Sequence, residues 1–214
     1  MIKRSDLETP RTVDEMEELL RSFSKDRTYS NEDIHRRHGI VKTLLEEYEP
    51  LSTLACHLNA RSARLTARSH EGPDGIIQLQ SSKQLGVQIT VANQSPQEAL
   101  TRKRLSRGQP TFATTKKFKD RTTGQIVESG RVLTTREARL RGQVQAVVTA
   151  VEKKREKFHE GTEALLVVTR ISLHDSGINY SWKQDLKKRV EDLGTIPYKR
   201  LYLANGDELI PIIE

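Results

Sequence analysis

The sequence has little of what would tie the protein to a membrane or to an oxidising compartment. It contains 1 cysteine, Cys56, in 214 residues, which excludes a disulfide within the chain and a zinc site built from cysteines. No stretch approaches the roughly 18 consecutive apolar residues that a transmembrane helix needs. The first residues, Met-Ile-Lys-Arg-Ser-Asp, lack the apolar segment of a signal peptide. These absences predict a cytoplasmic protein, and Cys56 is interpreted as a small core residue.

Several common motifs of binding and catalysis are also missing. Gly72, Gly75 and Gly86 are isolated glycines, so there is no glycine-rich phosphate loop. His35 and His38 lie three residues apart and could ligate zinc, but no third ligand stands at a motif spacing. Nucleotide binding through such a loop and zinc-dependent hydrolysis therefore have no support in the sequence.

Apolar residues are scarce and charge is unevenly distributed. Hydrophobic residues make up 35% of the chain and charged residues 30%, so we expect a modest core under a heavily charged surface. Residues 1–50 hold 9 Lys/Arg against 12 Asp/Glu, whereas residues 101–160 hold 16 against 6. Positive charge concentrated in one stretch predicts a polyanionic partner; a solvated basic face is the alternative.

Helix and strand signals follow one another in a clear order. A capping box over Thr12–Glu15 predicts the start of one helix, and Asn31 predicts the start of another, which Pro50 is expected to end. Further helices are expected over residues 51–58, 95–107, 135–159 and 182–193. Strands are expected over residues 61–69, 75–80, 86–92, 111–118, 125–133, 164–171, 200–204 and 208–212.

This order predicts an α/β (α+β) fold with a mixed central sheet covered by helices on both faces. The apolar stretch over residues 164–171 is expected at the centre of the sheet. Asn205-Gly206 is typical of a type I′ turn and predicts a C-terminal hairpin. Residues 1–30 are interpreted as an N-terminal helical arm, and residues 31–214 as the α/β domain.

Two neighbouring strands carry polar residues where a metal ion could bind. Asp74 opens the strand expected over 75–80, and Gln88 lies between Val87 and Ile89 in the next strand. Adjacent strands can hold the two side chains side by side at one edge of the sheet. Two oxygen ligands placed in this way could fix Mg²⁺ against a scissile phosphate.

Pro73-Asp74 on one strand and Gly86-Val-Gln-Ile-Thr90 on the next resemble the PD-(D/E)XK nuclease superfamily, together with the long helix and the apolar strand that follow. The resemblance covers roughly residues 31–172 and implies a restriction-endonuclease-like fold that hydrolyses DNA phosphodiester bonds with Mg²⁺ or Mn²⁺. It implies that Asp74 is the first acid of the motif and ligates the metal. Gln88 stands where the second acid belongs and Thr90 where the lysine belongs, so the motif is degenerate.

The resemblance also directs attention to substitutes for the missing groups. Lys154 lies on the helix expected over 135–159 and shares a face with three apolar residues, Val147, Val151 and Phe158. It is the candidate for stabilising the phosphate, the alternative being that its stem packs while the amine reaches solvent. Glu47, near the end of the early helix, is the candidate for a further metal ligand; Glu46 and Glu71 are alternatives.

The basic residues beside this site are the candidates for nucleic-acid contacts. Arg102, Lys103 and Arg104 lie on the helix expected over 95–107, and Lys116 and Lys117 on the polar hairpin that follows. Trp182 with Tyr180 could stack on a base, but a packing anchor at the start of a helix is the simpler interpretation.

Three functions remain open on this evidence. The first is a Mg²⁺-dependent DNA endonuclease, with Asp74, Gln88 and Lys154 as its catalytic residues. The second is a catalytically inactive nuclease-fold protein that still binds nucleic acid. The third is a protein-interaction module that uses the acidic N-terminal helices. The expected partner is nucleic acid, DNA before RNA, with no membrane contact; the oligomeric state stays open, a homodimer included.

Overall fold

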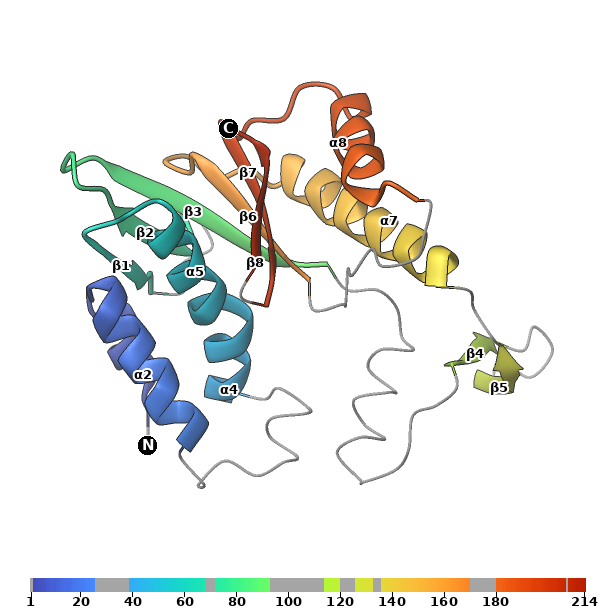
Figure 1. The fold of residues 1–214 in the computed structure, drawn as a ribbon, viewed down its shortest axis with the longest axis horizontal. Coiled ribbons are helices and arrows are strands. Elements are labelled where there is room, and N and C mark those ends of the chain that lie inside the picture. Colours follow the sequence, from blue (N-terminus) through green and yellow to red (C-terminus); the bar gives the residue numbers. More distant parts are fainter. Residues whose placement is uncertain are drawn as a thin grey trace.

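The computed structural model describes residues 2–25, 39–67, 72–92, 114–119, 126–132, 136–169, 180–206 and 208–214. They form a six-stranded mixed sheet between two layers of helices (Figure 1). The predicted mixed sheet with helices on both faces is therefore confirmed. None of the helices in these ranges is long and apolar enough to cross a membrane.

The sheet is antiparallel at its edges and parallel at its centre. In spatial order its strands are β1 (Ser62–Leu65), β2 (Gly75–Gln78), β3 (Gln84–Val91), β6 (Ala164–Thr169), β7 (Arg200–Asn205) and β8 (Glu208–Ile213). β3, β6 and β7 are parallel, and the other neighbouring pairs are antiparallel. All six residues of β6 are buried, because helices cover a central parallel strand from both sides.

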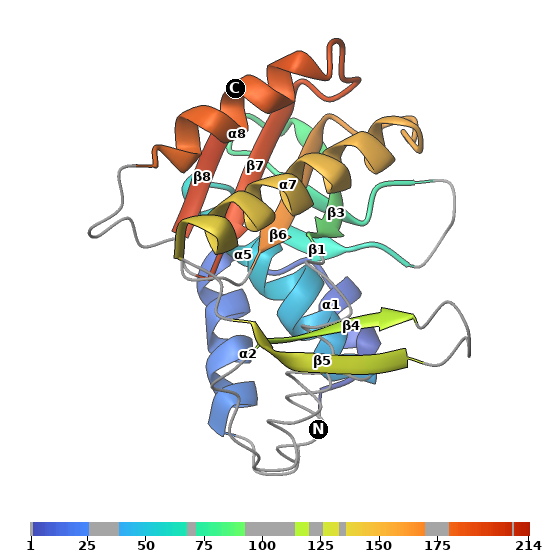
Figure 2. The same ribbon diagram turned by 90° about the vertical axis from the view of Figure 1, so that its right-hand side faces the viewer.

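The helices divide between the two faces of the sheet (Figures 1 and 2). The α5 face is covered by α1 (Arg4–Glu8), α2 (Val13–Lys25), α4 (Gly39–Thr43), the π-helical turn η1 (Leu44–Tyr48) and α5 (Glu49–His57). The α7 face is covered by α7 (Arg136–Arg155) and α8 (Trp182–Asp192). Each face has its own apolar cluster, so the sheet separates two cores.

The N-terminal helices pack on the sheet. The predicted capping box is present: the backbone N–H of Thr12 donates to Glu15 Oε2 at 2.7 Å, and that of Glu15 donates to Thr12 Oγ1 at 3.3 Å. Leu7 and Met16 are fully buried in the same cluster as Leu54 of α5. The described part of the segment predicted as an arm, residues 2–25, thus contributes to the core of the α5 face.

The prediction that Pro50 ends the second helix was wrong. The chain passes from η1 directly into α5, with Pro50 in the first turn of α5. Proline has no N–H and its ring displaces the preceding turn of an ordinary helix. Here the N–H of Glu49 donates to the carbonyl of Leu44, five residues back, and this wider π-helical turn admits the ring.

The remaining elements agree with the predictions apart from their ends. The polar hairpin is present as β4 (Thr114–Lys119) paired with β5 (Ile126–Val132) in a separate two-stranded sheet. α7 ends at Arg155, four residues before the predicted end at 159. The helix predicted over 95–107 lies outside the described residues. In the C-terminal hairpin Asn205 pairs with Glu208, and Gly206 has a φ of +60°, a value that glycine adopts without strain.

Trp182 and Tyr180 anchor the start of α8. Both are buried in the cluster of the α7 face. The Tyr180 hydroxyl donates to Asp185 at 2.5 Å, and the Arg141 guanidinium lies 4.3 Å from the centre of the Tyr180 ring. These contacts confirm the packing interpretation over base stacking.

Candidate functional site

The register of the first three strands arranges polar residues of the α7 face in rows. Ser62, Gln78 and Gln84 lie directly opposite one another across β1, β2 and β3. Gly75 pairs with Val87, so one residue further along the register Asp74 lies opposite Gln88. The predicted placement of Asp74 and Gln88 on neighbouring segments of the sheet is therefore present in the fold.

Asp74 is held against β3 by its own carboxylate. It stands immediately before β2 and is half-buried. Its Oδ2 accepts a hydrogen bond from the backbone N–H of Ile89 at 2.7 Å, and its backbone carbonyl accepts one from the N–H of Thr66 at 3.0 Å. The carboxylate thus links β2 to the strand that carries Gln88.

Gln88 is 1% exposed and both ends of its side-chain amide have partners. Nε2 donates to the backbone carbonyl of Lys157 at 3.4 Å, and Oε1 accepts a hydrogen bond from the Tyr198 hydroxyl. The same hydroxyl lies 3.0 Å from the backbone carbonyl of Lys154, so its single proton is shared between two acceptors. A buried amide satisfied in this way costs little to bury.

These contacts complete the C-terminal end of α7. The last carbonyls of a helix have no partner within the helix. Here the carbonyl of Lys157, just beyond the helix, accepts from Gln88. The carbonyl of Lys154, in the last turn, accepts from the Lys157 N–H at 3.1 Å and also from Tyr198. Side chains of the sheet region thereby cap the helix, which gives Gln88 a structural role.

Tyr198 joins the two sides of this cluster. The Phe158 ring packs edge-on against its ring, with 5.5 Å between the ring centroids. Burial, and then the negative charge of Asp74, raise the pKa of the Tyr198 hydroxyl to about 12. Asp74 lies opposite Gln88 in the strand register. Residues that lie directly opposite on adjacent antiparallel strands point to the same face, so the carboxylate and the amide lie on the same side of the sheet.

Lys154 and Glu47 do not join the cluster in the way the resemblance implied. Lys154 is half-buried and its contact with the cluster is through its backbone carbonyl. Phe158, expected on the same apolar helix face, lies beyond the end of α7 and is 41% exposed. Glu47 lies on η1, where its Oε2 is 3.5 Å from Arg4 Nη1. Arg4 also donates to the carbonyl of Thr66 at 3.2 Å, so Glu47 is linked to the neighbourhood of Asp74 through Arg4.

The predicted nucleic-acid residues are only partly within the described chain. Arg102, Lys103 and Arg104 lie outside it, as do His35, His38 and Glu71. Lys116 and Lys117 lie in β4, and Lys117 is opposite Glu128 in the register of the hairpin.

A Mg²⁺ ion prefers several oxygen ligands, carboxylates among them, and the side-chain oxygens predicted to ligate it at this cluster are those of Asp74 and Gln88. Asp74 is the carboxylate that the contacts above place in the cluster, and the Gln88 oxygen accepts a hydrogen bond from Tyr198. Within the described ranges no group of three or more His, Cys, Asp and Glu residues could hold a metal ion. As arranged, these side chains do not fit a Mg²⁺ site.

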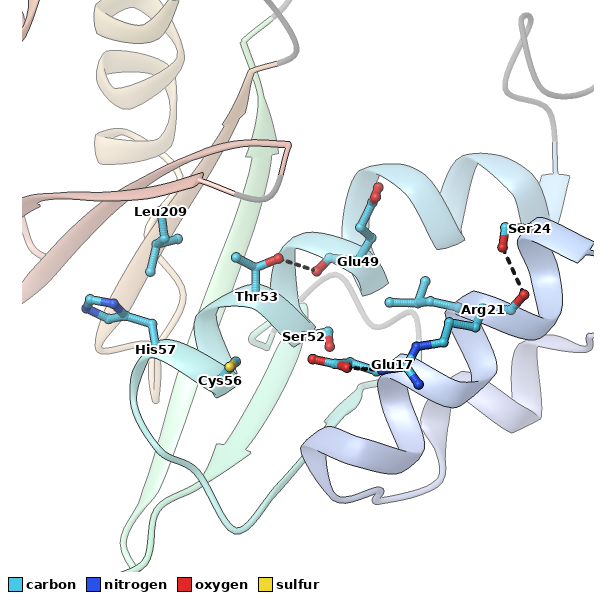
Figure 3. Close-up of a pocket in the computed structure, with 10 residues that line it drawn as sticks. Glu17, Arg21, Ser24, Glu49, Ser52, Thr53, Cys56, His57 and Leu209 are labelled. Atoms are coloured by element: carbon cyan, nitrogen blue, oxygen red, sulfur yellow. Dashed lines mark hydrogen bonds and ion pairs between the residues drawn. The ribbon is translucent and has the colours of Figure 1, made fainter.

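Figure 3 shows a hollow between α2 and α5, two helices of the α5 face, which we call the α2–α5 groove. It encloses about 570 Å³ between α2, α5 and Leu209 of β8. Cys56 lines it and is exposed, so its interpretation as a core residue was wrong. The signal was present in the sequence: Glu49, Ser52 and Cys56 recur at helical spacing and form a polar stripe on α5.

No protein-family model, curated protein or solved structure matches this chain. The functional assignment therefore rests on contacts, burial and charge. Tyr198 was not recognised in the sequence because no motif surrounds it, although it provides the central hydrogen bond of the cluster.

Proposed function

We propose that this chain is a nucleic-acid-binding protein with a restriction-endonuclease-like core that does not cleave its ligand. The order of elements supports the fold: an antiparallel β1–β2–β3 unit, then α7, then β6 parallel to β3. The observation that carries the absence of cleavage is the saturated amide of Gln88, bonded to Tyr198 at one end and to the Lys157 carbonyl at the other.

The energetic argument favours a structural over a catalytic Gln88. To ligate a cation, the Gln88 oxygen would have to exchange its hydrogen bond with Tyr198 for the ion. The Tyr198 hydroxyl would keep only the Lys154 carbonyl as an acceptor. A neutral amide also contributes less to cation affinity than the carboxylate of the family motif. The position of the second acid is thus used for folding.

The charge of the chain supports a nucleic-acid ligand. Residues 101–160 hold 16 Lys/Arg against 6 Asp/Glu, and a polyanion releases counterions when such a stretch binds it. The proposed contact residues are Arg102, Lys103 and Arg104, with Lys116 and Lys117 of the hairpin. DNA is the proposed partner, with RNA as the alternative to be compared in the same assay.

The binding test is a fluorescence-anisotropy titration of a short labelled DNA duplex, repeated over a series of salt concentrations. We expect affinity that falls steeply with salt, and a weaker affinity with a flatter salt slope after charge reversal at Arg102, Lys103 and Arg104. Charge reversal at Lys187 and Lys188, exposed residues of α8, is the matched control and should have a smaller effect. Undetectable binding at about 50 mM salt would overturn the proposal in favour of a protein-interaction module.

A Mg²⁺-dependent DNA endonuclease is the second candidate, favoured by the position of Asp74 and Gln88 on one side of the sheet. A plasmid-nicking assay with Mg²⁺ or Mn²⁺ separates the two candidates. We expect no nicking, and equal DNA affinity for the wild type and Asp74→Ala. Nicking that Asp74→Ala abolishes would replace the non-cleaving proposal with the endonuclease.

A further inference from the structure

Part of the α7 face of the sheet is open beside the cluster described above. A hollow of about 170 Å³ lies over β1, β2 and the start of β3. We call it the sheet hollow and define it by Ser62, Arg64, Ile76, Gln78 and Gln84, which line it together with Pro10 and Ala63.

The alternation of side chains explains why this surface is open. Ala63, Leu65 and Ile77 point to the α5 face and are buried in its core. Their neighbours Arg64 and Ile76 point the other way and are half-buried. Among the described helices of this face, α7 packs mainly against β3 and β6. The base of the hollow is therefore formed by largely polar side chains of β1, β2 and the start of β3.

The chemistry of the sheet hollow suits an anion. Among the described residues that line it, Arg64 is the ionisable side chain and none is a carboxylate. Gln78 and Gln84 add amide donors and Ser62 a hydroxyl, all in one cross-strand row. One Gln78 contact, from Nε2 to the Lys83 carbonyl, is long at 3.5 Å. A guanidinium with neutral hydrogen-bond donors beside it is a typical phosphate-binding arrangement.

An added peptide strand does not suit this place. The outer edge of β1 is already occupied, since Arg11 and Ala63 exchange backbone hydrogen bonds of 3.1 and 2.8 Å. Strand addition requires such an edge to be free. Among the described residues that line the hollow, Ile76 is the one large apolar side chain, so they offer little surface to a hydrophobic peptide anchor.

We infer that the sheet hollow binds a backbone phosphate of the nucleic acid through Arg64, with Gln78, Gln84 and Ser62 as neutral hydrogen-bond donors. The inference rests on the proposed function and extends it, because it places a contact on the sheet itself in addition to the basic stretch over 101–160. The bound strand would run past Asp74, which follows Arg64 and Ile76 along the same face.

Arg64→Ala tests the inference, with Arg61→Ala as its matched control. Arg61 is exposed, lies three residues away and does not line the hollow. Loss of one charged hydrogen bond predicts an affinity about tenfold weaker for Arg64→Ala, and loss of one phosphate contact predicts a salt slope smaller by about 1. Arg61→Ala should change neither quantity. Gln84→Glu, at an exposed position of the hollow, should also weaken binding by adding a negative charge.

The outcomes separate this inference from the proposed function. If the wild type does not bind DNA or RNA at low salt, the proposed function fails. If the wild type binds but Arg64→Ala and Arg61→Ala give equal affinities and slopes, the sheet hollow is not a phosphate site and the proposed function stands. The inference would also be overturned if Arg64→Ala bound DNA as tightly as the wild type but no longer bound an acidic peptide that the wild type binds. Equal melting temperatures of the two variants exclude misfolding as the cause.

Discussion

Tyr198 donates a hydrogen bond to the side-chain oxygen of Gln88, a residue 110 positions earlier in the chain. The contact joins the segment before β7 to the middle of β3 and passes across β6, which lies between them. It also reaches the last turn of α7 through the Lys154 carbonyl. Three separate segments therefore meet at one phenol.

Tyr198→Phe should destabilise the protein by about 1–3 kcal/mol, because it leaves the buried side-chain oxygen of Gln88 without its donor. The Lys154 carbonyl keeps its hydrogen bond from the Lys157 N–H. Chemical denaturation measures the loss. Tyr48→Phe is the control: the Tyr48 hydroxyl is buried and has no hydrogen-bond partner among the described residues. Its removal should leave the stability unchanged or raise it. Equal losses in the two variants would show that Tyr198 does not act through its hydroxyl.

Gln88→Glu places a carboxylate where the proposed nuclease-like motif would have its second acid. It should lower the free energy of unfolding by about 3 kcal/mol at neutral pH. The substitution replaces the donor to the Lys157 carbonyl by an oxygen and brings a charge into a buried site near Asp74. Both effects raise the pKa of the introduced carboxyl. Its protonated form is favoured in the folded state, so the loss should be smallest at low pH and grow as pH rises. Urea denaturation at acidic and neutral pH measures this.

The control for that substitution is Gln84→Glu, which changes the same residue type on the same strand at an exposed position. It should have little effect on stability. A Gln88→Glu protein that is as stable as the wild type, binds Mg²⁺ more tightly and nicks DNA would instead support the endonuclease.

Local signals predicted most of the elements. Thr12 and Glu15 form a capping box that depends only on residues three apart. The apolar stretch from Ala164 became the fully buried central strand, because its composition suits burial on both faces. Pro50 was misread because the π-helical turn that admits it depends on how the helix packs, which local composition does not reveal.

The candidate site was predictable only in part. The strand pair placed Asp74 and Gln88 together, since adjacent antiparallel strands follow from local pattern and turn. The partner of Gln88 could not be predicted, because the Tyr198 contact joins residues distant in sequence and exists only once α7 and β7 are in place. The prediction for Cys56 was wrong because a cysteine is more often buried than exposed, whereas here it belongs to the polar stripe of α5 and lines the α2–α5 groove.

Stability should fall at alkaline pH through the buried tyrosines. The pKa values of Tyr48, Tyr180 and Tyr198 are raised from 10.0 to about 12, in each case mainly by burial. Between these values the unfolded chain releases the phenol protons while the folded protein retains them, so folding stability decreases as pH rises. The decrease is at most about 1.4 kcal/mol per pH unit for each tyrosine, and it levels off above pH 12.

Phenolate absorbance during a pH titration tests this expectation. The three tyrosines should ionise only as the protein unfolds, and the same titration in denaturant should show all tyrosines ionising near pH 10. Reversible ionisation of most tyrosines near pH 10 without unfolding would contradict it.

Gly86→Ala should destabilise the protein, because β3 and the turn at Gly161 are in close contact. A Cβ at position 86 would lie 2.1 Å from the backbone oxygen of Gly161 and 3.3 Å from the Pro73 Cβ. The backbone would have to move, which predicts that the free energy of unfolding falls by about 2 kcal/mol.

Gly142→Ala is the control: Gly142 is exposed on α7, and a Cβ there would meet nothing within 4 Å. Since alanine favours a helix over glycine by about 1 kcal/mol, this variant should be stabilised. Thermal and urea denaturation should show that Gly86→Ala is less stable than the wild type and Gly142→Ala more stable. Equal stabilities of the two variants would show that β3 and the Gly161 turn do not pack as described.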